Sequence, residues 1–178
     1  MPTPIFMNAF TAAVAAIGVA AASFVGMDHE PAAYDDVIVT RLSQDEAALN
    51  ATFAFMRADR DGDETLSVDE YAALMVVTAE LANLNGFVAV ETRNSVATIA
   101  LPVSAPGALG DEEQTRIDAV ARHTFYAFAG NDGKMQQGEY LELQNSIFAA
   151  SDLNANGSLT NAELSIFAQR QANLRPNA

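Results

Sequence analysis

Cysteine is absent from the 178-residue sequence, and histidine occurs only twice. The lack of cysteine excludes zinc sites built on thiolates, and it removes any disulfide signal for the compartment in which the protein works. His29 and His123 are too few and too isolated to indicate a transition-metal site. With no cysteine nucleophile, no phosphate-binding glycine-rich loop and no catalytic arrangement around either histidine, the sequence predicts a protein that is not an enzyme.

Basic residues are also scarce. Nine Lys and Arg stand against 23 Asp and Glu, which gives a formal net charge of −14. Nucleic acids and anionic membrane surfaces carry negative charge themselves, so this balance argues against either as a partner. Half of the residues are hydrophobic, enough for a sizeable core. The length predicts one domain, or one domain with an N-terminal extension.

Residues 5–27 contain no charged side chain and are rich in alanine. Three interpretations remain open: a cleaved signal peptide over residues 1–22, an uncleaved membrane anchor, and a buried helix of a soluble protein. The small residues favour the signal peptide, although no Lys or Arg precedes the apolar run. A signal peptide predicts a periplasmic or secreted protein, whereas an anchor predicts a membrane-anchored one. Residues 23–42, which include Pro31 and an acidic cluster, are predicted to be a linker.

Acidic residues at every second position mark the first loop, residues 59–70, with the sequence Asp-Arg-Asp-Gly-Asp-Glu-Thr-Leu-Ser-Val-Asp-Glu. Oxygen-bearing residues fall at positions 1, 3, 5, 9 and 12, the spacing by which a twelve-residue loop wraps one Ca²⁺. The predicted ligands are the side chains of Asp59, Asp61, Asp63 and Glu70 and the backbone carbonyl of Thr65. Glu64 stands at position 6, where such loops have glycine, and this departure is expected to weaken the site without abolishing it.

The third loop, residues 152–163, repeats the pattern with glycine at position 6. Its predicted ligands are Asp152, Asn154, Asn156, Ser158 (backbone carbonyl) and Glu163. Between the two lies a second loop, residues 128–139, which matches only the later positions. Phe128 and Gly130 supply no side-chain oxygen at positions 1 and 3, so this loop is predicted to be degenerate and structural.

These loops resemble those of the EF-hand calcium-binding family, which includes calmodulin and many small bacterial calcium binders. The resemblance covers about residues 43–173 and implies an all-α domain of helix–loop–helix hands. Ser43 and Glu46 form a capping-box pattern that predicts a helix leading into the first loop. Residues 87–110 depart from the family, and their β-branched runs indicate a short extended or hairpin insertion. Residues 174–178 are predicted to be a tail, and which loops pair is open.

The resemblance implies that Ca²⁺ is the cofactor. The function predicted is calcium binding by an exported protein, with a structural, buffering or sensing role. The alternative is an interaction subunit anchored in a membrane or assembly, in which calcium is only structural and another protein is the partner.

Overall fold

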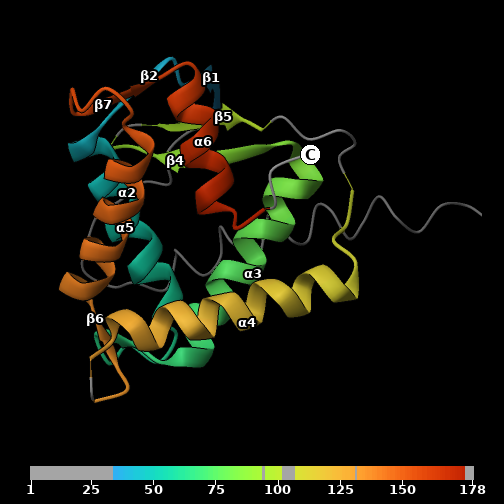
Figure 1. The fold of residues 1–178 in the computed structure, drawn as a ribbon, viewed down its shortest axis with the longest axis vertical. Helices are drawn as coiled ribbons and strands as arrows, with labels where there is room; N and C mark the ends of the chain where they lie inside the picture. Colours follow the sequence, from blue (N-terminus) through green and yellow to red (C-terminus); the bar gives the residue numbers. More distant parts are fainter. Residues whose placement is uncertain (1–33, 94, 102–106, 131, 175–178) are drawn as a thin grey trace, which may run out of the picture.

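The structure is a computed structural model, and it describes residues 34–93, 95–101, 107–130 and 132–174. The fold is mixed α/β, so the prediction of an all-α domain is wrong. The helices are α2 (Gln44–Ala58), α3 (Val68–Asn85), α4 (Asp111–Phe128), α5 (Gln137–Ser151) and α6 (Ala162–Gln171). The strands are β1 (Tyr34–Ile38), β2 (Arg41–Ser43), β3 (Thr65–Leu66), β4 (Phe87–Glu91), β5 (Val96–Ala100), β6 (Met135–Gln136) and β7 (Ser158–Thr160). Figure 1 shows their arrangement.

A three-stranded sheet overturns the all-α expectation. β4 and β5 pair antiparallel in the segment where β-branched runs indicated a hairpin, and β1 joins β5 in parallel, giving the order β1-β5-β4. Side chains alternate along β4, where Val88 and Val90 are buried and Ala89 between them is exposed. This period of two places the apolar side chains on one face of the sheet, where they pack into the core. β1 and the first two residues of β2 lie within residues 23–42, the stretch expected to be a linker.

Local signals account for where the helices begin and end. Ser43 Oγ accepts a hydrogen bond from Glu46 N at 3.3 Å, and the Glu46 carboxylate accepts one from Ser43 N at 2.8 Å. This capping box satisfies backbone donors that the first turn of α2 would leave unpaired. α3 ends at Gly86, whose φ of 73° lies in the left-handed region that glycine adopts without a steric cost.

Two short strand pairs connect distant parts of the chain. β2 pairs antiparallel with β7, with Leu42 opposite Leu159, and β3 pairs antiparallel with β6, with Leu66 opposite Met135. The pairs lie at opposite ends of α2 and α5, which pack against each other (Figure 1).

The two halves of the molecule share one pattern. Leu42 and Met135 are separated by the same number of residues as Leu66 and Leu159. The same shift along the sequence takes α2 onto α5, and both helices are 15 residues long. Each half therefore has the order strand, helix, loop, strand, helix, and the first strand of each half pairs with the second strand of the other.

The core consists of two clusters. The first lies among α2, α3, α4, α5 and the β3–β6 pair. The second lies among β2, β7, α6 and the inner face of the sheet, with contributions from α2, α3 and α5. Aromatic side chains contribute to both: Tyr71 and Phe125 meet at 6.0 Å between ring centroids in the first, and Phe148 and Phe167 meet at 6.2 Å in the second. Both ends of the helix pair thus rest on packed apolar side chains.

Within the described ranges, no helix is both long and apolar enough to cross a membrane. The predicted signal peptide or anchor at residues 1–22 lies outside the described residues, as do residues 175–178 of the predicted tail.

Candidate metal centre

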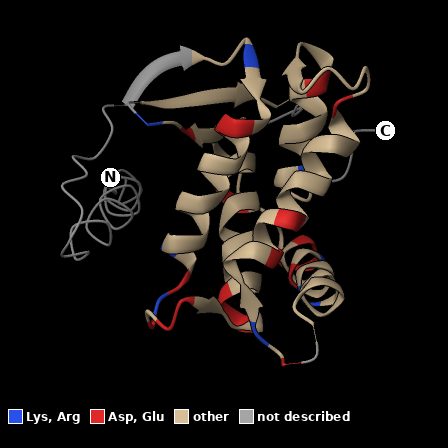
Figure 2. Ribbon diagram, turned by 90° about the vertical axis from the view of Figure 1, so that its left-hand side faces the viewer, with Lys and Arg blue, Asp and Glu red and all other residues tan. Residues whose placement is uncertain are grey.

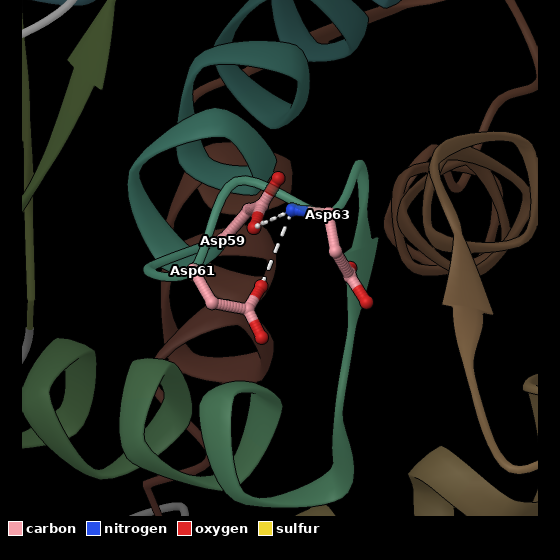
Figure 3. A group of neighbouring side chains, drawn as sticks. All are labelled: Asp59, Asp61 and Asp63. Atoms are coloured by element: carbon pink, nitrogen blue, oxygen red, sulfur yellow. Dashed lines mark hydrogen bonds between the residues drawn. The ribbon is translucent and has the colours of Figure 1, made fainter.

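The first loop begins where α2 ends. Asp59 is the C-cap residue of α2, with its backbone N–H donating to Phe55 O at 3.0 Å. Asp61 and Asp63 follow on the exposed side of the loop. Each of the three side chains offers a carboxylate oxygen, and these oxygens lie within 4.8 Å of one another (Figure 3). The structure therefore brings together three residues that the spacing predicted to be ligands.

The loop backbone is wound around the Asp59 carboxylate. This group accepts hydrogen bonds from Gly62 N at 2.8 Å, Asp63 N at 3.2 Å and Glu64 N at 3.0 Å. Asp63 N also donates to Asp61 Oδ1 at 3.2 Å, as Figure 3 shows. These hydrogen bonds fix the positions of the Asp59 and Asp61 carboxylates within the loop.

Glu64 occupies the turn position where the sequence departs from glycine. Its φ is 65°, in the left-handed region, so the chain keeps the turn despite the Cβ. Such a conformation costs a residue with a side chain about 1 kcal/mol.

Glu70 closes the loop from the third position of α3. Its Oε1 accepts from Arg60 N at 2.9 Å, while its Oε2 accepts from Ser67 N at 2.9 Å and from Ser67 Oγ at 2.8 Å. Partial burial acts to raise the pKa of Glu70, but the hydrogen bonds from Ser67 and Arg60 outweigh it, so the pKa lies below its ordinary value. Glu70 is thus ionised and spans the loop, although it is not a member of the three-aspartate cluster.

The third loop repeats the hydrogen bonds that its first and last carboxylates accept from equivalent backbone positions. Asp152, the C-cap of α5, accepts from Asn156 N at 3.2 Å and from Gly157 N at 2.8 Å. Glu163 Oε1 accepts from Leu153 N at 3.1 Å, and its Oε2 accepts from Thr160 N at 3.1 Å. These bonds repeat those of Asp59 and Glu70, so the two loops share one backbone arrangement.

Donor chemistry distinguishes the two loops. Asn154 and Asn156 take the places of two aspartates, so the third loop has only two carboxylates. Asn156 Oδ1 accepts from Ser158 N at 2.8 Å, and Asn154 Nδ2 donates to Glu163 Oε1 at 2.7 Å. Glu163 is buried, with 6% of its surface exposed. The third loop therefore has a less negative set of oxygens, and its closing carboxylate is more enclosed than that of the first loop, where Glu70 is only partly buried.

The second loop retains only the later part of the pattern. Glu139 Oε2 accepts from Gln136 N at 2.8 Å, and Asp132 Oδ1 accepts from Lys134 N at 3.0 Å. α4 continues to Phe128, so the first position of this loop lies inside a helix. Through the β3–β6 pair the second loop lies beside the first, whereas the third loop lies beside β2.

Two basic residues beside the loops were missed by sequence reasoning. Lys134 Nζ in the second loop donates to Asp63 Oδ2 at 2.5 Å, and Arg41 in β2 donates to Ser158 Oγ through Nε at 3.1 Å and Nη2 at 2.8 Å. The hydrogen bond from Lys134 is the largest cause that lowers the pKa of Asp63 to about 2. The sequence offset that relates the first loop to the third also relates Arg41 to Lys134, but the contact of Lys134 with Asp63 depends on the β3–β6 pairing, which no local pattern indicates.

The donor set fits a hard divalent cation. The first loop offers carboxylate and backbone oxygens, and the third loop offers side-chain amide oxygens as well. These are the ligands that Ca²⁺ and Mg²⁺ prefer, and neither loop contains an imidazole or a thiolate. Figure 2 shows acidic positions in the loop region at the foot of the helices, with basic positions beside them. Comparison of the chain with protein-family models, with curated proteins and with solved structures gave no match.

Proposed function

We propose that this protein binds Ca²⁺ in its first and third loops, in the manner of EF-hand loops. The observation that carries the proposal is the hydrogen-bond pattern shared by two loops far apart in the sequence. In each, the first carboxylate accepts from the backbone at the turn and the last carboxylate joins the second residue to the ninth. In the first loop, carboxylate oxygens of positions 1, 3 and 5 also lie within 4.8 Å of one another, and oxygen ligands of this kind are what Ca²⁺ takes in its six- to eight-fold coordination.

The negative charge of the first loop supports the binding of a cation there. The first loop brings carboxylate oxygens of Asp59, Asp61 and Asp63 within 4.8 Å of one another, so these carboxylates repel one another when no cation is bound. Ca²⁺ removes this repulsion, and its binding stabilises the folded state by linkage. At a free concentration one hundred times the dissociation constant, one site adds about 2.7 kcal/mol to the free energy of unfolding.

The packing of methionines supports a structural or buffering role. Sensor proteins of this type open on binding calcium and expose a groove rich in methionine. Here Met75 and Met135 are buried, at 4% and 0% exposed, within the first core cluster. Opening this core would break the β3–β6 pair, so we propose that Ca²⁺ consolidates the fold. Export stays a prediction, because the segment that suggests it lies outside the described residues.

Calorimetric titration of the full chain with Ca²⁺ tests the proposal. The wild type is compared with Glu70→Gln and Glu163→Gln, each of which removes one closing carboxylate. Glu139→Gln is the matched control, because Glu139 makes the same cap contact in the second loop, where positions 1 and 3 have no side-chain oxygen. A thermal melt of every variant in calcium and in chelator reports folding separately from binding.

Two binding events are expected for the wild type and for Glu139→Gln. Glu70→Gln should lose one event and Glu163→Gln the other. Melts of the wild type that coincide in Ca²⁺ and in chelator, together with no heat of binding, would refute the proposal. Equal loss in all three variants would point to general destabilisation instead of site-specific binding, and it would also count against it.

A further inference from the structure

The two carboxylate oxygens of Asp63 have different neighbours. Oδ1 accepts hydrogen bonds from Thr65 N at 2.9 Å and from Thr65 Oγ1 at 2.5 Å. Both bonds lie within the first loop and hold the aspartate in place. Oδ2 makes neither of these bonds, which leaves it as the oxygen that can turn to a cation. Lys134 Nζ contacts this same oxygen at 2.5 Å from the neighbouring second loop.

We propose that Lys134 is a tethered competitor of the metal: its ammonium group holds the ligand oxygen of Asp63 in the metal-free protein and leaves when Ca²⁺ binds. Lys134 thereby lowers the affinity of the first loop for Ca²⁺. This inference rests on the proposed function, since it concerns the regulation of the same site. It also assigns a role to the second loop. That loop has no side-chain oxygen for a metal ion at its own first and third positions, but its Lys134 contributes a positive charge to the neighbouring first loop.

The electrostatic surroundings of Lys134 support this role. The hydrogen bond to Asp63 is the largest cause that raises the pKa of Lys134 above its ordinary value, and the charges of Asp61 and Asp132 act in the same direction. The ammonium group therefore lies in the combined field of carboxylates from both loops. A bound Ca²⁺ would compete with it for Asp63 and would repel it. Because the pair is at the surface, with Asp63 37% and Lys134 53% exposed, the effect is moderate and sensitive to salt.

The third loop provides an internal comparison. Arg41 is the counterpart of Lys134, yet it donates to Ser158 Oγ and does not contact a carboxylate of the third loop. The residue equivalent to Asp63 is Asn156, which is neutral and offers no ion pair. Direct competition is therefore specific to the first loop, where the ligands carry the greater charge. The lysine offsets part of that charge when the metal is absent.

The test is a Ca²⁺ titration of the full chain followed by NMR. The backbone amides of Gly62 and Gly157 report the first and third loops separately, with a competing chelator added where binding is too tight to read directly. Lys134→Gln removes the competing charge. Arg41→Gln is the matched control, because it changes the net charge equally at the equivalent position but leaves Asp63 untouched. A melt confirms that both variants are folded.

Lys134→Gln is expected to tighten binding at the loop reported by Gly62 by about three- to tenfold at low salt, and less at high salt. Arg41→Gln should leave that site unchanged. Calcium binding with the same affinity at that loop in the wild type and in Lys134→Gln would overturn this inference while leaving the proposed function intact. A calcium response of the Gly62 amide in Lys134→Gln that is absent from the wild type would support this inference. An absence of calcium response at both glycines in both proteins would overturn the proposed function and this inference together.

Discussion

Leu66 provides a direct test of how the first loop is held to the core. Its side chain is fully buried, at 0% exposed, and it lies opposite Met135 in the β3–β6 pair. Leu66→Ala removes three carbon atoms, worth about 2 kcal/mol of transfer free energy at about 0.8 kcal/mol each. The cavity left behind adds to this, since such substitutions cost about 2 to 5 kcal/mol in well-packed cores. We expect a loss of about 3 kcal/mol in the free energy of unfolding.

Urea denaturation followed by circular dichroism, in chelator so that metal binding does not contribute, measures this loss. Leu159→Ala should cost a similar amount, because Leu159 is equally buried at the equivalent position opposite Leu42. Leu153→Ala is the control: this leucine belongs to the third loop but is 69% exposed, so its loss should change stability by less than about 0.5 kcal/mol. If Leu66→Ala cost no more than Leu153→Ala, the short strand pairs would not be the anchors of the loops.

Three further predictions concern the loop backbone and the first helix. Glu64→Gly relieves a left-handed φ of 65° and should raise the stability of the metal-free protein by up to about 1 kcal/mol in urea denaturation, whereas Glu64→Ala, which keeps the Cβ, should not gain this amount. Ser43→Ala removes the N-cap acceptor of Glu46 N and should lower the free energy of unfolding by about 0.5 to 2 kcal/mol in a thermal melt; an unchanged melt would contradict the role of the cap. The hydrogen bond from the Ser43 side chain is the largest cause that holds the pKa of Glu46 below its ordinary value of 4.5. Its contribution to stability is therefore complete above that value and is lost as the pH falls, so Glu46→Gln should flatten the acid side of a stability–pH profile.

Local features of the candidate site could be predicted from the sequence because they depend on near neighbours. The alternation of aspartates indicated a loop starting at Asp59, and the structure ends α2 at Ala58 and places the three carboxylates together. The Ser43–Glu46 pattern indicated a capping box, and its hydrogen bonds are present. Each of these features is fixed within a few residues of chain. Whether the loops bind calcium stays a prediction.

Pairings between distant segments could not be predicted in this way. β1 has a stretch of acidic residues and lies next to β5 only through a parallel pairing, so its strand character depends on a segment far along the chain. The pairing of the first loop with the second likewise depends on Leu66 meeting Met135. Lys134 acquires its significance only through that pairing, since its own loop gives no reason for it to contact Asp63.

The failure of the all-α expectation has a physical cause in the two halves of the molecule. α3 and α6 occupy equivalent places, and each has an apolar face that must be covered. α3 is covered mainly by α4 and also contacts β4, whereas α6 packs against α5 and against β4 and β5. Phe167 on α6 and Val90 on β4 lie in the same cluster, each with no more than 2% of its surface exposed. A sheet with an apolar face covers a helix as well as another helix does, because burial depends on area and fit and not on the type of element. The loops could therefore keep one geometry in both halves while the element that supports them changed from a helix to a sheet.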